Sequence, residues 1–150
     1  MTASRLFIPP EALAQIEREA RGAFPSECCG LLEGVCADDM LRILAAHPTR
    51  NLSLEPDRFE IDPRDQIRLM RELRGTGREV VGCYHSHPNG REEPSPRDLQ
   101  SAAEPGFVWL IAAVDASGPV KIRVFAFTGS RFEPLLVRGS VESPISPAAS

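Results

Sequence analysis

The feature that most constrains this 150-residue chain is a pair of histidines at the end of an apolar segment. Residues 79–84 (EVVGCY) are typical of a short buried strand, and His85 and His87 follow directly. Residues two apart in a strand project to the same side, so both imidazoles are expected to face one way. Asp98 follows within the same short stretch. Two imidazole nitrogens and one carboxylate oxygen suit zinc and leave a fourth position for water.

The segment around Asp98 also has a purely structural interpretation. Residues 95–98 (SPRD) match a helix start, with Ser95 as N-cap, Pro96 at the first helical position and Asp98 three residues after the cap. A first-turn carboxylate can still reach a neighbouring metal. The sequence therefore leaves capping and metal binding open as separate or shared roles.

The combination resembles the JAMM/MPN+ metalloproteases, whose pattern is an upstream Glu, then His-x-His-Pro, six residues and Ser-x-x-Asp. Residues 25–34 (PSECCGLLEG) resemble the first segment and residues 84–98 the second. Asn51 and residues 58–63 (RFEIDP) fit the small bacterial members. The resemblance extends over roughly residues 5–137.

This resemblance implies roles for individual residues. His85, His87 and Asp98 would bind one zinc ion, which lowers the pKa of its bound water to about 7. Glu27 would act as general base and then as general acid, and Ser95 would help to hold the tetrahedral intermediate. Glu27 lies 58 residues before His85, so only its Cys-Gly-Leu-Leu context singles it out.

The fold class expected is mixed α/β, with a curved mixed sheet and flanking helices. The resemblance implies the MPN fold, which is related to the cytidine deaminase fold. The chain lacks the His-x-Glu and Pro-Cys-x-x-Cys ligand motifs of deaminases, which disfavours deamination. One catalytic domain is expected over residues 1–138, followed by a disordered Ser/Pro-rich tail over 139–150.

Periodicity and turn residues predict the order of elements. Helices are expected over 10–24, 63–74 and 95–103, and strands over 4–8, 29–32, 40–46, 58–61, 79–84, 107–114, 120–127 and 131–137. On the second helix, an apolar face is expected to point inward, and a basic stripe is expected to be solvated or to meet an acidic partner. The apolar face comprises Ile67, Met70 and Leu73, and the stripe comprises Arg64, Arg68 and Arg71.

Composition excludes several classes of function. A formal charge of −4 and a pI near 5.4 argue against nucleic-acid binding, which normally requires a basic surface. No stretch reaches the roughly 18 apolar residues of a membrane helix, and no signal peptide is recognisable. A soluble, cytoplasmic protein without membrane association is therefore expected.

The four cysteines show neither a Cys-x-x-Cys pair nor the density of a disulfide framework, which predicts reduced thiols. Cys83 shares the strand face of His85, so it is either an additional ligand or a small buried hydrophobe. Cys28 and Cys29 adjoin Glu27, and whether any of these three thiols regulates the site stays open.

The function expected is hydrolysis of the amide or isopeptide bond after the C-terminal Gly-Gly of a ubiquitin-like sulfur-carrier protein, releasing an extension or an amino acid such as cysteine. One alternative is a deubiquitinase-like or desampylase activity on lysine conjugates. Others are a non-catalytic MPN scaffold and a DNA-repair-associated JAB-like protein. The carrier, the leaving group and the oligomeric state stay open.

Overall fold

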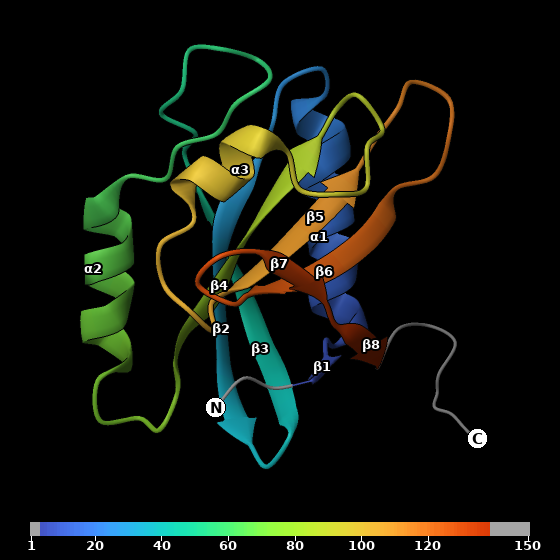
Figure 1. The fold of residues 1–150 in the computed structure, drawn as a ribbon. Coiled ribbons are helices and arrows are strands. Elements are labelled where there is room, and N and C mark those ends of the chain that lie inside the picture. Colours follow the sequence, from blue (N-terminus) through green and yellow to red (C-terminus); the bar gives the residue numbers. More distant parts are fainter. Residues whose placement is uncertain (1–3, 139–150) are drawn as a thin grey trace.

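In the computed structural model, which describes residues 4–138, eight strands form one mixed sheet in the order β7-β6-β5-β4-β2-β3-β1-β8 (Figure 1). The strands are β1 (Arg5–Phe7), β2 (Cys29–Ala37), β3 (Met40–Thr49), β4 (Glu79–His87), β5 (Val108–Ala113), β6 (Lys121–Phe127), β7 (Phe132–Pro134) and β8 (Leu136–Arg138). The helices are α1 (Pro10–Ala23), α2 (Pro63–Leu73) and α3 (Pro96–Ser101). The expected tail, 139–150, lies outside the described residues.

The sheet is curved and nearly closed, which confirms the expected mixed fold. β7 and β8 lie at opposite ends of the strand order, yet only Leu135 separates them in the chain. The Leu135 N–H donates to the Val124 carbonyl at 2.8 Å. The single strand expected over 131–137 is therefore wrong, because the segment pairs first with β6 and then with β1.

One face of the sheet packs against α1. Leu13, Ile16 and Ala20 of this helix are buried against sheet residues that include Leu32 and Tyr84. The Tyr84 hydroxyl donates to Glu19 Oε1 at 2.6 Å, which ties α1 to the middle of β4. The N-terminal half of the chain thus supplies the cover for this face.

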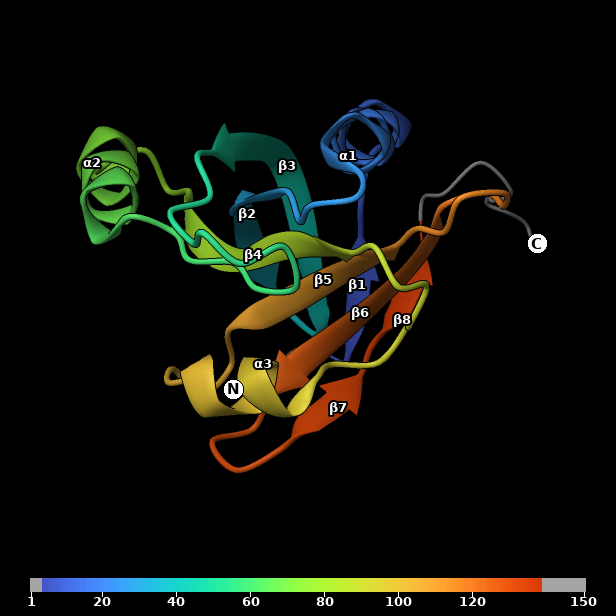
Figure 2. The ribbon, with the colours of Figure 1, turned by 90° about the horizontal axis from the view of Figure 1, so that it is seen from above.

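The opposite face packs against α2 and carries α3, so α1 and α3 lie on opposite sides of the sheet (Figure 2). Leu69, Leu73, Leu31, Cys83 and Trp109 form its buried apolar cluster. Strand alternation places Cys83 on this face beside His85, and the residue is buried within the apolar cluster. Cys83 therefore occupies the position of a small buried hydrophobe.

The predicted inward face of α2 is partly wrong. Leu73 is buried, but Ile67 and Met70 are 48% and 52% exposed, and Leu69 takes their place. Leu69 and Leu73 lie four residues apart and therefore on one helix face, which meets β4. Which of two similar apolar stripes faces inward is set by that contact.

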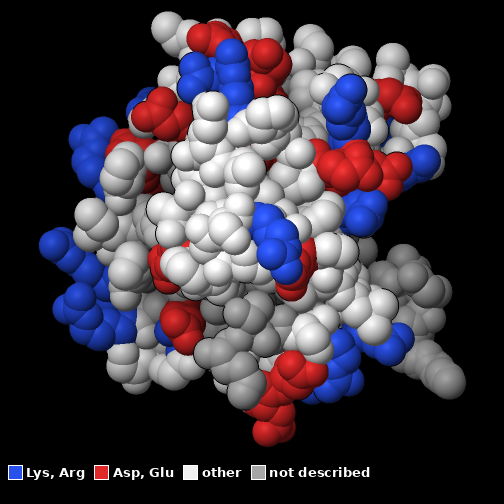
Figure 3. Space-filling view, viewed as in Figure 1, with Lys and Arg blue, Asp and Glu red and all other residues white. Residues whose placement is uncertain are grey.

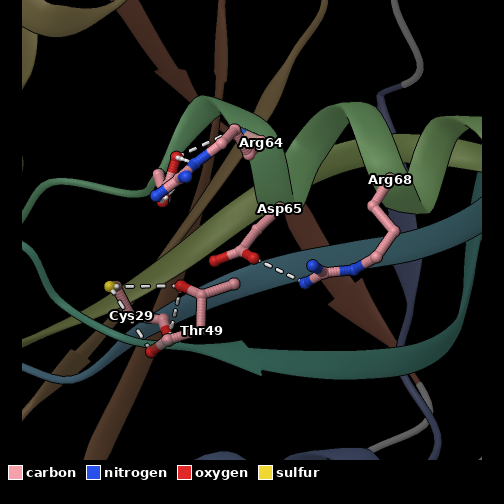
Figure 4. A network of polar contacts seen from close by, with 6 residues as sticks. Cys29, Thr49, Arg64, Asp65 and Arg68 are labelled. Carbon is pink, nitrogen blue, oxygen red and sulfur yellow. Dashed lines mark hydrogen bonds and ion pairs between the residues drawn. The ribbon is translucent and has the colours of Figure 1, made fainter.

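The basic stripe of α2 is solvated and partly neutralised by its own helix. Arg64 pairs with the N-cap residue Asp62 at 2.8 Å, and Arg68 pairs with Asp65 at 2.5 Å (Figure 4). Lys and Arg atoms gather along the edge of the molecule that α2 occupies, with acidic atoms among them (Figure 3). Within residues 4–138, no helix combines the length and apolar character that a membrane crossing requires.

The strand expected over 58–61 is absent from the described residues. This segment makes a single bridge, between Asn51 and Ile61. The Asn51 side chain accepts from the N–H groups of Ser53 and Glu60, both at 2.9 Å, and donates to the Arg58 carbonyl at 3.0 Å. The Asn51 side chain thus provides hydrogen-bond partners for backbone groups of this loop. In a strand, such groups would pair with a neighbouring strand instead.

Gly30 is predicted to be essential for the packing of Tyr84. A Cβ at Gly30 would overlap the buried Tyr84 ring, so Gly30→Ala should destabilise the protein by about 1 to 3 kcal/mol. Gly22→Ala in α1 is the control, because a Cβ there meets nothing and removes backbone freedom from the unfolded chain. Urea unfolding measures both. Equal stability of the two variants would contradict the packing role of Gly30.

Candidate metal centre

Three donor atoms converge at the end of β4. His85 Nε2 lies 3.0 Å from His87 Nε2, and each lies 3.2 Å from Asp98 Oδ2. The histidines end β4 and Asp98 lies in the first turn of α3, and all three residues are buried. Among the described residues, this is the group of His, Cys, Asp and Glu side chains with the geometry to hold a metal ion.

Hydrogen bonding alone does not account for this arrangement. Each ring nitrogen offers either one proton or one lone pair, so three mutually adjacent atoms cannot all be well paired. Tetrahedral ligands about 2.0 to 2.1 Å from zinc stand about 3.3 to 3.4 Å apart, close to the separations of these donors. The site therefore fits a small divalent cation.

The tautomer of His87 is set by the backbone. Its Nδ1 lies 3.0 Å from the Arg91 carbonyl oxygen, which can only accept, so Nδ1 carries the proton. The lone pair of Nε2 is then free to bind a metal. A backbone carbonyl behind the ring is a common way to orient a ligating histidine.

His85 is held by aromatic packing. Its ring stacks on Phe59 with centroids 4.1 Å apart and an interplanar angle of 16°, and it meets the edge of Trp109. Burial lowers the pKa of His85, which favours the neutral form that a metal ligand needs. Its Nδ1 has no hydrogen-bond partner among the described residues.

Asp98 caps its helix and faces the imidazoles with the same oxygen. Oδ2 accepts from the Ser95 N–H at 2.8 Å, and Ser95 Oγ accepts from the Asp98 N–H at 3.1 Å. The predicted capping box is therefore present. Burial acts to raise the pKa of Asp98, but contacts with His85 and His87 hold it well below its ordinary range. Capping and metal coordination are compatible here.

Strand register brings Glu27 to the cluster. Cys29 pairs with His85, and the ladder continues outward because Cys28 N–H donates to Ser86 Oγ and Ser86 N–H donates to the Cys28 carbonyl. One further step places Glu27 beside His87. Glu27 is 7% exposed, and its Oε1 has no hydrogen-bond partner within the described range.

Glu27 is poised to exchange a proton near neutral pH. Burial raises the pKa of its carboxyl to about 7, while the neighbouring His87 acts in the opposite direction. A carboxyl whose pKa lies near the working pH suits a general base that later acts as an acid.

The entrance to the site is a pocket of about 300 Å³. Glu27, His87, Ser95 and Arg91 all line it, together with Asp57, Pro88, Asn89, Glu93, Pro94 and Pro96. The Asn51 amide donates to the Glu27 carbonyl at 3.1 Å, so the same residue that orders the 51–61 loop also fixes the backbone of Glu27.

Arg91 was not among the residues expected at the site. The signal available was the turn dipeptide Asn89-Gly90, in which Asn89 Oδ1 accepts from the Arg91 N–H at 3.0 Å. That turn directs the Arg91 carbonyl to His87. Of the five residues expected from sequence, Glu27, His87 and Ser95 line the pocket, and His85 and Asp98 contact His87.

Comparison with known proteins places the chain in a family. The model for prokaryotic homologs of the JAB domain matches residues 9–127. A desampylase from Haloferax volcanii is 35% identical over 142 residues, which cover 91% of this chain and 98% of that protein. A CysO-cysteine peptidase from Mycobacterium tuberculosis is 29% identical over 108 residues, covering 72% of this chain and 73% of that protein.

The fold is similar to that of a solved protein from Desulfitobacterium hafniense, with a TM-score of 0.77, 27% identity, and coverage of 91% of this chain and 95% of the other. The chain therefore belongs to the prokaryotic JAB-domain family, which the sequence motifs predicted.

Metal binding is predicted to depend on His87 and not on the remaining histidine, His47. After dialysis against zinc, the wild-type protein should retain about one ion per chain, and His87→Ala should lose most of it because two protein ligands hold zinc poorly. His47→Ala should keep it, since His47 pairs with Glu33 outside the cluster. Elemental analysis gives the result, and full occupancy in His87→Ala would contradict the assignment.

Glu27 is predicted to destabilise the metal-free protein at high pH. A carboxyl whose pKa rises from 4.5 to about 7 on folding contributes stability below pH 4.5 that is lost as the pH rises toward 7. Glu27→Gln removes this loss. In EDTA, the free energy of unfolding of Glu27→Gln minus that of the wild type should therefore be larger at pH 8 than at pH 5, by about 1 to 3 kcal/mol. Chemical unfolding at both pH values measures this difference. The exposed Glu72→Gln should show none.

Proposed function

We propose that this protein is a zinc-dependent hydrolase that cleaves the bond after the C-terminal Gly-Gly of a ubiquitin-like protein. The observation that carries the proposal is the buried carboxyl of Glu27, which lies beside the three converging donors and lacks a hydrogen-bond partner within residues 4–138. Membership in the JAB-domain family supports the same reaction. So do the names of its relatives, a desampylase and a CysO-cysteine peptidase.

His85, His87 and Asp98 would hold the zinc ion. When bound, zinc supplies Lewis acidity, which activates water and polarises a carbonyl oxygen. The chain contributes a buried, shaped site, because all three side chains are buried and the His85 ring is covered by Phe59. Exclusion of bulk water strengthens every charge interaction at this point.

Glu27 would move the proton. Hydrolysis adds one water across the C–N bond, so the carbonyl carbon gains an OH group and the leaving nitrogen gains a hydrogen. Glu27 accepts a proton from the water and returns it to the departing nitrogen, which balances the step. Burial raises the pKa of this carboxyl in the metal-free protein, which favours a group that can take up a proton as well as release it.

Ser95 would stabilise negative charge on the carbonyl oxygen. Its Oγ accepts from the Asp98 N–H, which leaves the hydroxyl proton free to donate into the pocket that Ser95 lines. A donor positioned where charge develops lowers the barrier more than it strengthens ground-state binding.

A Gly-Gly tail suits the entrance pocket, because glycine lets the backbone approach the buried donors closely. The second candidate is isopeptidase activity on lysine conjugates, which the similarity to the Haloferax volcanii desampylase favours. A purely structural scaffold has no need for an unpartnered buried glutamate beside a donor cluster, and the net charge of −4 disfavours a DNA-binding role.

Activity is predicted to require Glu27. A ubiquitin-like protein should be tested with its Gly-Gly end joined to cysteine, to a short extension and to the Nε of lysine, because the three probes separate the candidate leaving groups. Glu27→Gln should keep its zinc while turnover falls by about 100-fold or more. Glu72→Gln serves as control and should be unaffected. Near-normal turnover by zinc-loaded Glu27→Gln would refute the assigned role.

A further inference from the structure

The entrance pocket carries a cation with no partner of its own. Arg91 lines the pocket together with Glu27, His87 and Ser95. Its side chain makes no ion pair or hydrogen bond with any residue in the described part of the chain.

The position of Arg91 at the pocket is fixed by its backbone. The N–H donates to Asn89 Oδ1 at 3.0 Å, and the carbonyl accepts from His87 Nδ1 at 3.0 Å. The residue is thus anchored on both sides of its Cα, while the guanidinium is exposed and unpaired. The Cα of Arg91 is therefore held beside the imidazole of His87, one of the proposed metal ligands.

The acidic residues of the pocket do not form ion pairs with the Arg91 guanidinium. Asp57 lies 3.7 Å from Arg97, and Glu93 lies 3.7 Å from Arg123. Glu27 Oε1 is buried and has no hydrogen-bond partner among the described residues, so it does not pair with Arg91. Arg91 is the pocket-lining cation without a carboxylate partner among the described residues, so an incoming carboxylate would find it available.

The chemistry of the leaving group decides whether a carboxylate comes close. If the group leaving after Gly-Gly is a single C-terminal amino acid, its α-carboxyl carbon lies only about 2.5 Å from the leaving nitrogen. In a lysine conjugate the leaving nitrogen is the side-chain ε-amino nitrogen (Nζ, written Nε in the names of such conjugates), which lies at the end of a chain of methylene groups with no carboxylate nearby. A cation beside the reacting bond therefore distinguishes these two classes of substrate.

We propose that Arg91 is a specificity-determining residue that binds the free α-carboxylate of a one-residue leaving group. The inference rests on the proposed function and deepens it. The preferred substrate is a ubiquitin-like protein whose Gly-Gly end carries one further amino acid. Arginine binds a carboxylate through two parallel N–H donors, which rewards this group over an amide or a side-chain methylene.

The test compares three probes made from one ubiquitin-like protein. In the first, Gly-Gly carries alanine with a free carboxylate, in the second alanine amide, and in the third the Nε of lysine. The wild-type enzyme should cleave the free acid with a kcat/KM at least about tenfold above the amide, the scale of one hydrogen bond to a charged group. The lysine conjugate should be cleaved less well than the acid.

Arg91→Gln should bring the acid and amide rates within about twofold, mainly through a higher KM for the acid, because it removes ground-state binding. This variant keeps the backbone contact to His87, so zinc content and thermal stability should match the wild type. Arg91→Lys should retain part of the preference. Arg71→Gln on the exposed face of α2 makes the same charge change as a control and should retain all of it.

An unchanged acid-to-amide ratio in Arg91→Gln would overturn the inference, as would a wild-type preference for the lysine conjugate. Both outcomes leave the proposed hydrolase intact, because the enzyme is still turning over a Gly-Gly substrate. If the wild type cleaves none of the three probes, that result would instead contradict the proposed function, and the inference with it.

Discussion

Antiparallel pairing of β2 with β4 sets Cys29 opposite His85, and the polar groups of the candidate site are arranged around that pair. Because side chains alternate across a strand, this register places Glu27 and His87 on the same face of the sheet. A slip of one residue would turn Glu27 toward α1 and remove its carboxyl from the neighbourhood of His87. The apolar residues that follow on each strand help to hold the register, since a slip would also move Leu31 out of its cluster with Leu69 and Leu73.

The loop between β3 and α2 completes the site from the other side. Asn51 binds the carbonyls of Glu27 and Arg58 and the N–H of Glu60, so one side chain joins the backbone of Glu27 to the loop that carries Phe59. Phe59 then covers His85. Local hydrogen bonding in an irregular segment thereby helps to shield His85 from solvent.

The site retains features that cost stability. Glu27 Oε1 and His85 Nδ1 are buried without hydrogen-bond partners among the described residues, and each such atom costs about 1 to 3 kcal/mol. Three donors in mutual contact are likewise poorly satisfied by hydrogen bonds. Arrangements of this kind persist where function requires them, which is why they support the proposed chemistry more strongly than the family membership alone.

Short-range patterns in the sequence determined much of the molecule. Alternation placed His85 and His87 on one side of a strand, and the capping box placed Asp98 in the first turn of α3. The apolar run ahead of the histidines predicted β4. These features depend on residues within a few positions of one another, so local geometry decides them.

Tertiary structure decided what distant segments contribute. Only strand register could bring Glu27 to His87, and only the contact with β4 selected Leu69 over Met70 as the inward residue of α2. The role of the Arg91 carbonyl behind His87 likewise has no counterpart in composition or periodicity. Sequence by itself determined the donors, because their chemistry and spacing are local. The structure decided their neighbours, because pairing between strands depends on packing across the whole sheet.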